Sequence, residues 1–130
     1  MANKLILQGK IVTGVIERAF IVNGHRVGYV FDMLPDHRLR LAAWRRHYNR
    51  DKTAFSFLAG AFEQAKQAIT KPAQYCFIDE LGLIEAEGKG LWPALEAVIR
   101  LQTAKNLVVA VRPDLPGLFM ERINGLLEGI

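Results

Sequence analysis

The sequence predicts a single α/β domain over residues 1–130, with a mainly parallel sheet flanked by helices and a β-hairpin near the N-terminus. Two observations lead to this fold class. Strand-like runs flank the pair Asn23-Gly24, and an Asn-Gly pair in this setting is the strongest short signal for a two-residue hairpin. Further along, apolar runs alternate with segments of helical period, which favours parallel strands joined by right-handed helical crossovers.

The hairpin strands are expected within residues 11–34, where runs rich in β-branched and aromatic residues lie on both sides of the turn. Residues 35–52 are charged and irregular, and within them we expect a strand near 39–44. Apolar residues then recur at helical spacing over 57–69, which predicts a helix with one core face. Ser56 is expected to cap the N-terminus of that helix.

The second half of the chain contains two continuous apolar runs, residues 75–78 and 106–111, and each is typical of a strand covered on both faces. Between them, Pro93 opens a helix that is expected to end near Thr103, because proline suits the first helical turn. A last helix is expected over 116–127, with these residues facing inward: Leu118, Phe119, Ile123, Leu126 and Leu127.

Composition indicates an ordinary globular protein, with 51% hydrophobic and 23% charged residues among 130 and a net charge of +4. The excess positive charge is local. We interpret this basic stretch as a solvated face rather than a patch for phosphates or acidic surfaces, because no motif of nucleic-acid-binding proteins accompanies it. The stretch contains Arg38, Arg40, Arg45, Arg46, Arg50 and Lys52, with His37 and His47 among them.

The sequence also bears on the cellular compartment. Cys76 is the single cysteine, so an intramolecular disulfide is excluded, and a reducing cytoplasmic location is the simpler expectation. The longest apolar run is shorter than the 18 residues of a spanning helix, so we expect no membrane segment.

Asp79 and Glu80 directly follow the apolar run 75–78, in the pattern of a strand that delivers two carboxylates at its C-terminal end. Ligands bind at that end of open α/β sheets. In nucleotide hydrolysis such an aspartate helps to hold Mg²⁺, and the following carboxylate activates water. The alternative is that both residues merely cap the next turn, and the pattern alone favours neither interpretation.

A longer segment, YCFIDELGLIEAEGKGLWPALEAVI over 75–99, resembles the Walker B region of a family of small P-loop nucleoside-triphosphatases. The hairpin VTGVIERAFIVNGHRVGYVFDML, the segment FSFLAGAFEQA and the strand end AVRPDLP are similar to further parts of that family, so the resemblance covers about residues 12–125. It implies that Asp79 is the Mg²⁺ ligand and that Glu80 activates water. It also implies that Asp79, Glu85 and Arg112 lie near a bound ATP or GTP.

The phosphate-binding half of such a site is missing from the sequence. Family members carry a G-x-x-x-x-G-K-[ST] loop, whose N–H groups and lysine hold the phosphates. Around Gly9-Lys10 the first glycine is replaced by Lys4, and the magnesium-binding hydroxyl by Ile11. The chain therefore resembles a truncated NTPase-like domain that lacks its first strand and P-loop.

Two functions follow as alternatives. The first is a non-catalytic binding or assembly subunit, with at most weak nucleotide and Mg²⁺ binding, that forms a homo-oligomer or a heteromer through uncovered strand edges. The second is half of a split NTPase that hydrolyses ATP or GTP when a P-loop-bearing partner protein completes the site. A fragment of a longer product is a related possibility.

Overall fold

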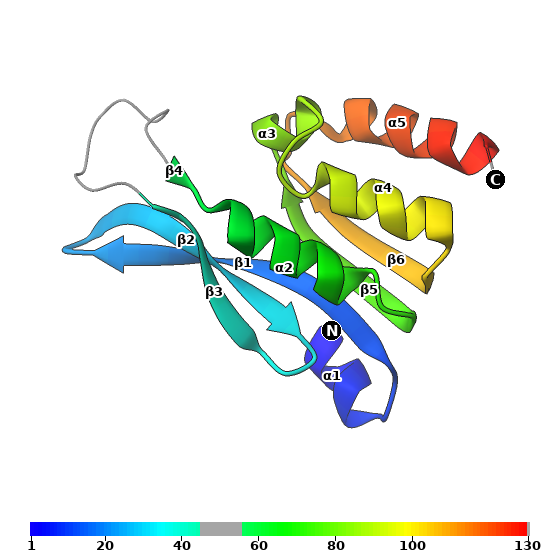
Figure 1. Ribbon diagram of the computed structural model, residues 1–130, viewed down its shortest axis with the longest axis horizontal. Helices are drawn as coiled ribbons and strands as arrows, with labels where there is room; N and C mark the ends of the chain where they lie inside the picture. The colour runs from blue at the N-terminus through cyan, green and yellow to red at the C-terminus, as the bar shows by residue number, and fades with distance from the viewer. Residues whose placement is uncertain (45–55, 130) are drawn as a thin grey trace.

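The computed structural model describes residues 1–44 and 56–129, which form one mixed sheet with helices packed against it (Figure 1). Five residues of the basic stretch, Arg45, Arg46, His47, Arg50 and Lys52, lie outside the described residues. In chain order the elements are α1 Ala2–Leu7, β1 Val12–Val22, β2 His25–Leu34, β3 Arg38–Trp44, β4 Ser56–Phe57, α2 Ala59–Ile69, β5 Ala73–Leu81, α3 Leu83–Ala86, α4 Trp92–Leu101, β6 Ala104–Val111 and α5 Pro116–Glu128.

The six described strands form a single sheet in the order β4-β3-β2-β1-β5-β6. The prediction of an α/β fold is confirmed, but the prediction of a mainly parallel sheet is wrong. The β4-β3-β2-β1 part is an antiparallel meander, and only β1-β5 and β5-β6 pair in parallel. The physical reason is that a chain returning through short connections pairs antiparallel, whereas parallel pairing needs a helical crossover.

The hairpin of β1 and β2 turns at Asn23-Gly24, as the sequence predicts. Both turn residues have positive φ, 51° for Asn23 and 76° for Gly24, which is the requirement of a type I′ turn. Pairing then continues from Val22 opposite His25 to Gly14 opposite Leu34. A strand near 39–44 is also confirmed, as β3.

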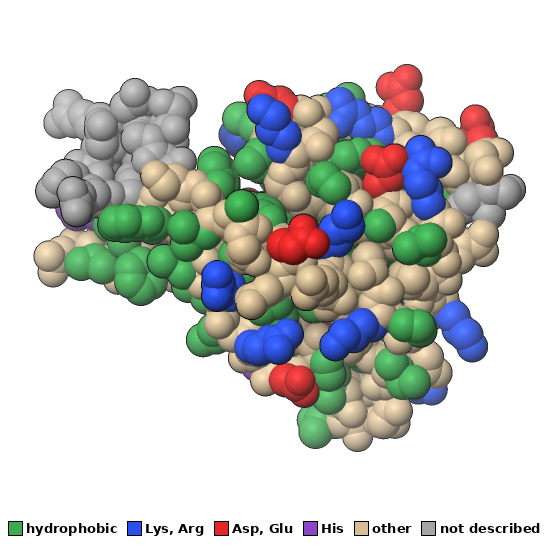
Figure 2. Space-filling view, viewed as in Figure 1, with side chains coloured by type: hydrophobic (Ala, Val, Ile, Leu, Met, Phe, Trp, Pro, Cys, Tyr) green, Lys and Arg blue, Asp and Glu red, His purple; other side chains and the backbone are tan. Residues whose placement is uncertain are grey.

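One face of the sheet is covered by α2 and α4, with α5 packed on α4, and Figure 2 shows acidic and basic side chains intermixed over this helical layer. The three long helices lie where helical spacing predicts them. Ser56 does not cap α2, because it belongs to β4 and the cap position is Leu58. Fully buried side chains beneath the helices include Val15, Phe31, Ile69, Ile78, Leu81, Leu95 and Phe119.

The opposite face of the sheet is covered only in part within the described chain. There, α1 packs Ala2, Leu5 and Ile6 against a small second core of Val12, Leu34 and Phe77. α1 itself has no buried residue. We call the rest of this face, on β1, β5 and β6, the open face.

β6 departs from the prediction that it is buried on both faces. Leu107, Val109 and Val111 pack against the helical core, but Val108 is 37% exposed and Ala110 is also exposed on the open face. α5 is similarly less buried than predicted. Phe119 is fully buried, whereas Leu118 and Leu127, both expected to face inward, are 36% and 53% exposed.

Candidate functional site

The carboxylates of Asp79 and Glu80 line two different hollows, although they are adjacent at the end of β5. Successive side chains of a strand point to opposite faces, and here Glu80 faces the helical side. Glu80 has φ 52°, the left-handed conformation that few non-glycine residues adopt. Asp79 lines a small hollow of about 80 Å³ on the open face, beside Phe77 and Val108.

Glu80 lines a polar hollow of about 170 Å³ at the C-terminal ends of β5 and β6, beside the middle of β1 and the first half of β2. We call this the charged hollow. Two of the other residues predicted from the sequence, Glu85 and Arg112, also line it. The structure therefore brings three of the four predicted site residues together and separates Asp79 from them. The full lining is Glu17, Arg18, Ala19, Arg26, Tyr29, Glu80, Gly82, Glu85 and Arg112.

Glu85 has a clear structural role. Its Oε1 accepts a hydrogen bond from the N–H of Gly82 at 2.9 Å, and its Oε2 accepts one from the N–H of Leu91 at 3.1 Å. With only 3% of its surface exposed, this side chain holds together the connection from β5 to α4. Burial raises the pKa of Glu85, and the two backbone N–H groups oppose that rise.

The Gly88-Lys89-Gly90 segment serves the same connection. Gly88 and Gly90 have φ values of 82° and 61°, and a Cβ at Gly90 would collide with the carboxylate of Glu85. Glycine is required there because of this close approach.

Asp79 is also engaged with the backbone. Its Oδ2 accepts a hydrogen bond from the N–H of Glu17 at 3.2 Å, which ties the end of β5 to β1. In the described residues, no group of three or more His, Cys, Asp or Glu side chains could hold a metal ion. Mg²⁺ binding at Asp79 would depend on ligands such as phosphate oxygens, so the predicted weak binding stays a prediction.

Glu17 is a site residue that the sequence reasoning missed. Burial raises the pKa of Glu17 from its usual 4.5 to about 8, and the negative charges of Glu85, Glu80 and Asp79 act in the same direction. Arg26 opposes the rise. Burial also raises the pKa of Tyr29 in the same hollow, with smaller contributions from Glu17 and Glu85. Strand alternation gives a signal for Glu17, because it lies on the same side of β1 as the core residue Val15.

The arginines of the charged hollow have partners of their own. Arg112 bonds to Asp114 through Nε at 3.2 Å, and the N–H of Arg112 donates to the carbonyl of Leu81. Arg18 bonds to Asp32 at 2.7 Å. The hollow therefore combines arginine and glutamate side chains at close quarters and is not a uniformly basic phosphate cradle.

A second polar cluster lies beneath α1. Asp32 is 2% exposed and bonds to Arg18 and to Nδ1 of His37, while Nε2 of His37 bonds to Oδ1 of Asn3 at 2.8 Å. Burial alone would raise the pKa of Asp32, but the hydrogen bonds from His37 and Arg18 outweigh it and hold that pKa below its usual value. This cluster fixes α1 to the sheet.

Comparison of the chain with known protein families, with curated proteins and with solved structures finds no match. The resemblance to small P-loop nucleoside-triphosphatases therefore remains an expectation from the motifs. In the part of the chain that the structure describes, no helix is long and apolar enough to cross a membrane.

Proposed function

We propose that this chain is a non-catalytic binding or assembly subunit, a P-loop-less relative of small nucleoside-triphosphatases with at most weak nucleotide and Mg²⁺ binding. The observation that carries the proposal is that the carboxylates of the candidate site bond to the backbone or lie apart from one another. Asp79 and Glu85 accept hydrogen bonds from backbone N–H groups, and Asp79 and Glu80 line different hollows. Hydrolysis would need the metal ligand and the water-activating carboxylate to face one bound phosphate.

The missing phosphate loop supports the same proposal. A transferring phosphoryl group develops charge that Mg²⁺, a lysine and backbone N–H groups must stabilise. The sequence has no G-x-x-x-x-G-K-[ST] loop to supply the last two. The single cysteine, Cys76, is buried and free, and we propose a cytoplasmic setting for the subunit.

The alternative, half of a split NTPase, draws support from the charged hollow. Arg26 and Arg112 line it together with Glu80, and guanidinium groups suit the recognition of phosphate. In this alternative a partner protein supplies the P-loop, so hydrolysis appears only in the mixture of the two proteins.

The experiment is a titration of the purified chain with fluorescent ATP and GTP analogues in the presence of Mg²⁺, together with an assay of phosphate release. The variant Asp79→Asn tests the metal ligand, and Glu63→Gln on the exposed side of α2 is the matched control. We expect no phosphate release and no saturation below about millimolar nucleotide. Tight, Mg²⁺-dependent binding with phosphate release, lost in Asp79→Asn alone, would refute the proposed function.

A further inference from the structure

β6 has an unpaired edge although it is built like an interior strand. Its eight residues pair with β5 on one side, and β6 ends the sheet on the other. The N–H of Arg112 donates to the carbonyl of Leu81 on β5, so alternation directs the backbone groups of Val108 and Ala110 toward β5 and those of Leu107 and Val109 toward the free edge. A long free edge of this kind is a template for pairing with another chain.

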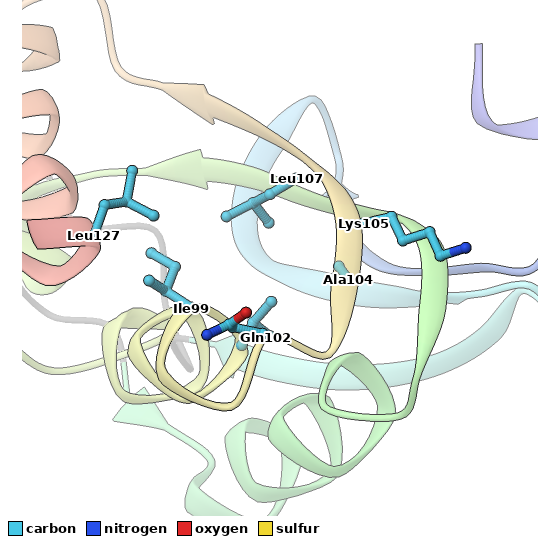
Figure 3. A pocket seen from close by; sticks show the side chains of 7 residues that line it. Ile99, Gln102, Ala104, Lys105, Leu107 and Leu127 are labelled. Atoms are coloured by element: carbon cyan, nitrogen blue, oxygen red, sulfur yellow. The ribbon is translucent and has the colours of Figure 1, made fainter. Parts of the chain in front are cut away.

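Beside this edge lies an apolar groove of about 360 Å³ between β6, α4 and the end of α5. Figure 3 shows Leu107, Ile99 and Leu127 pointing into this space from the three elements, while Lys105 points away. On the other side of β6, Val108 and Ala110 are exposed on the open face. A strand added at this edge would therefore meet apolar surface on both of its faces.

The strand that suits this edge is β6 itself. Among the described strands longer than two residues, β6 is the one that lacks a partner along the whole of one side, since β1 and β3 are free on one side over only part of their length and β4 spans Ser56–Phe57. It is also apolar toward both faces. We infer that β6 pairs antiparallel with β6 of a second copy of this chain, which makes one continuous sheet across a two-fold axis.

The charges on the strand agree with this pairing. When Val108 faces its own counterpart, Lys105 lies opposite Val111 of the second copy and not opposite another lysine. In this register the C-terminal end of one β6 lies beside the N-terminal end of the other. Asp114, which follows β6, is therefore on the same side of the interface as Lys105 of the second copy. Opposite charges near one another favour an interface, and like charges directly opposed would weaken it.

The same two-fold axis brings the two α5 helices toward each other on the helical side of the joined sheet. Met120 and Leu127 on α5 are 57% and 53% exposed in the single chain, and contact between the helices would remove apolar surface of this kind from water. This inference rests on the proposed assembly function and names its partner.

The test is the molar mass in solution, measured by light scattering and sedimentation from about 1 to 100 μM, which spans ordinary dimer affinities. We expect twice the chain mass of 14.6 kDa for the parent. Val108→Lys places two like charges opposite each other at the two-fold axis, and Val108→Pro disrupts the strand at the centre of the interface, so both variants should be monomeric. The matched control is Leu39→Lys. It changes an exposed apolar residue on β3, away from β6, so this variant should stay dimeric.

A cross-linking measurement tests the register. Facing residues of an antiparallel pair have Cα atoms about 4.5–5.5 Å apart, which lies within disulfide range. Val108→Cys should give a disulfide-linked dimer on mild oxidation, and Leu39→Cys should not. The native Cys76 is buried and does not compete.

Each outcome decides the inference. A monomeric parent across the whole range, or a dimer that persists when both folded Val108 variants are made, overturns pairing through β6. Circular dichroism shows whether each variant is folded, and if Val108→Pro does not fold, Val108→Lys and the cross-link decide. Nucleotide hydrolysis would instead overturn the proposed function and leave the mass measurement unaffected, so the two failures are distinguishable.

Discussion

Glu17 offers the sharpest prediction about stability. Its pKa is about 8 in the folded chain and usually 4.5, so between these values the unfolded chain releases the proton of Glu17 while the folded chain keeps it. The stability that depends on this proton is fully present below about pH 4.5 and is lost as the pH rises to about 8. The Glu17→Gln variant carries no ionisable group there and should escape this loss.

The magnitude follows from the two pKa values. Their difference is 8 − 4.5 = 3.5, and each pKa unit is worth about 1.4 kcal/mol, which gives an upper limit of about 5 kcal/mol. Glu17 is only partly buried, and screening by solvent reduces this figure, so we expect the parent to lose about 2–4 kcal/mol more than Glu17→Gln between about pH 5 and pH 8.5.

The assay is urea unfolding followed by circular dichroism at several pH values for the parent, Glu17→Gln and the exposed control Glu63→Gln. The control should follow the parent at every pH, because Glu63 lies in solvent on α2. Equal pH dependence of the parent and Glu17→Gln would refute the reasoning. Titration of the Glu17 carboxyl carbon by NMR measures the pKa directly, and a titration midpoint near the usual 4.5 would also refute the reasoning.

Three further changes follow from the packing. Gly90→Ala places a Cβ against the carboxylate of Glu85 at a φ of 61°, and chemical unfolding should show a loss of about 2–3 kcal/mol; a neutral result would contradict the close approach. Phe119→Ala should cost about 3–5 kcal/mol in the same assay, whereas Leu118→Ala one position away should cost less than about 1, and equal costs would contradict the observed packing of α5. Asp32→Asn should lower the free energy of unfolding at pH 7 by about 1–3 kcal/mol, because buried hydrogen bonds to a charged acceptor are lost. The pKa of Asp32 lies below its usual 3.8, so the stability that the charged carboxylate contributes is present above pH 3.8 and is lost as the pH falls through the folded pKa. If the free energies of unfolding of the parent and Asp32→Asn still differ in acid, this explanation is wrong.

Local chemistry was enough to predict the longer strands and helices of this fold, but not the short elements α1, β4 and α3. Asn23-Gly24 determines a turn that no distant contact needs to enforce, and helical spacing placed α2, α4 and α5 because each buries one face. The neighbours of β6 could not be predicted. An apolar run such as residues 106–111 shows that both faces favour burial, but it does not show which part of the chain, or which second chain, covers them.

The candidate site shows the same division. Glu80, Glu85 and Arg112 were predicted from their motifs and do share a hollow. Glu17 was missed because it reaches the site through the pairing of β1 with β5, across 62 residues of sequence from Asp79. Strand alternation could have indicated that Asp79 and its neighbour Glu80 would face opposite sides, since adjacent residues of a strand rarely share a face.

The charged hollow and the apolar edge meet at β6, whose C-terminal end places Arg112 in the hollow while Val108 borders the free edge. The two features can nevertheless be changed separately, because Glu17 lies on β1 with β5 between it and β6. Glu17→Gln should therefore change the pH dependence of stability without changing the molar mass, and Val108→Lys should do the reverse. A change in mass with Glu17→Gln would mean that Arg112 transmits the state of the hollow to the β6 edge.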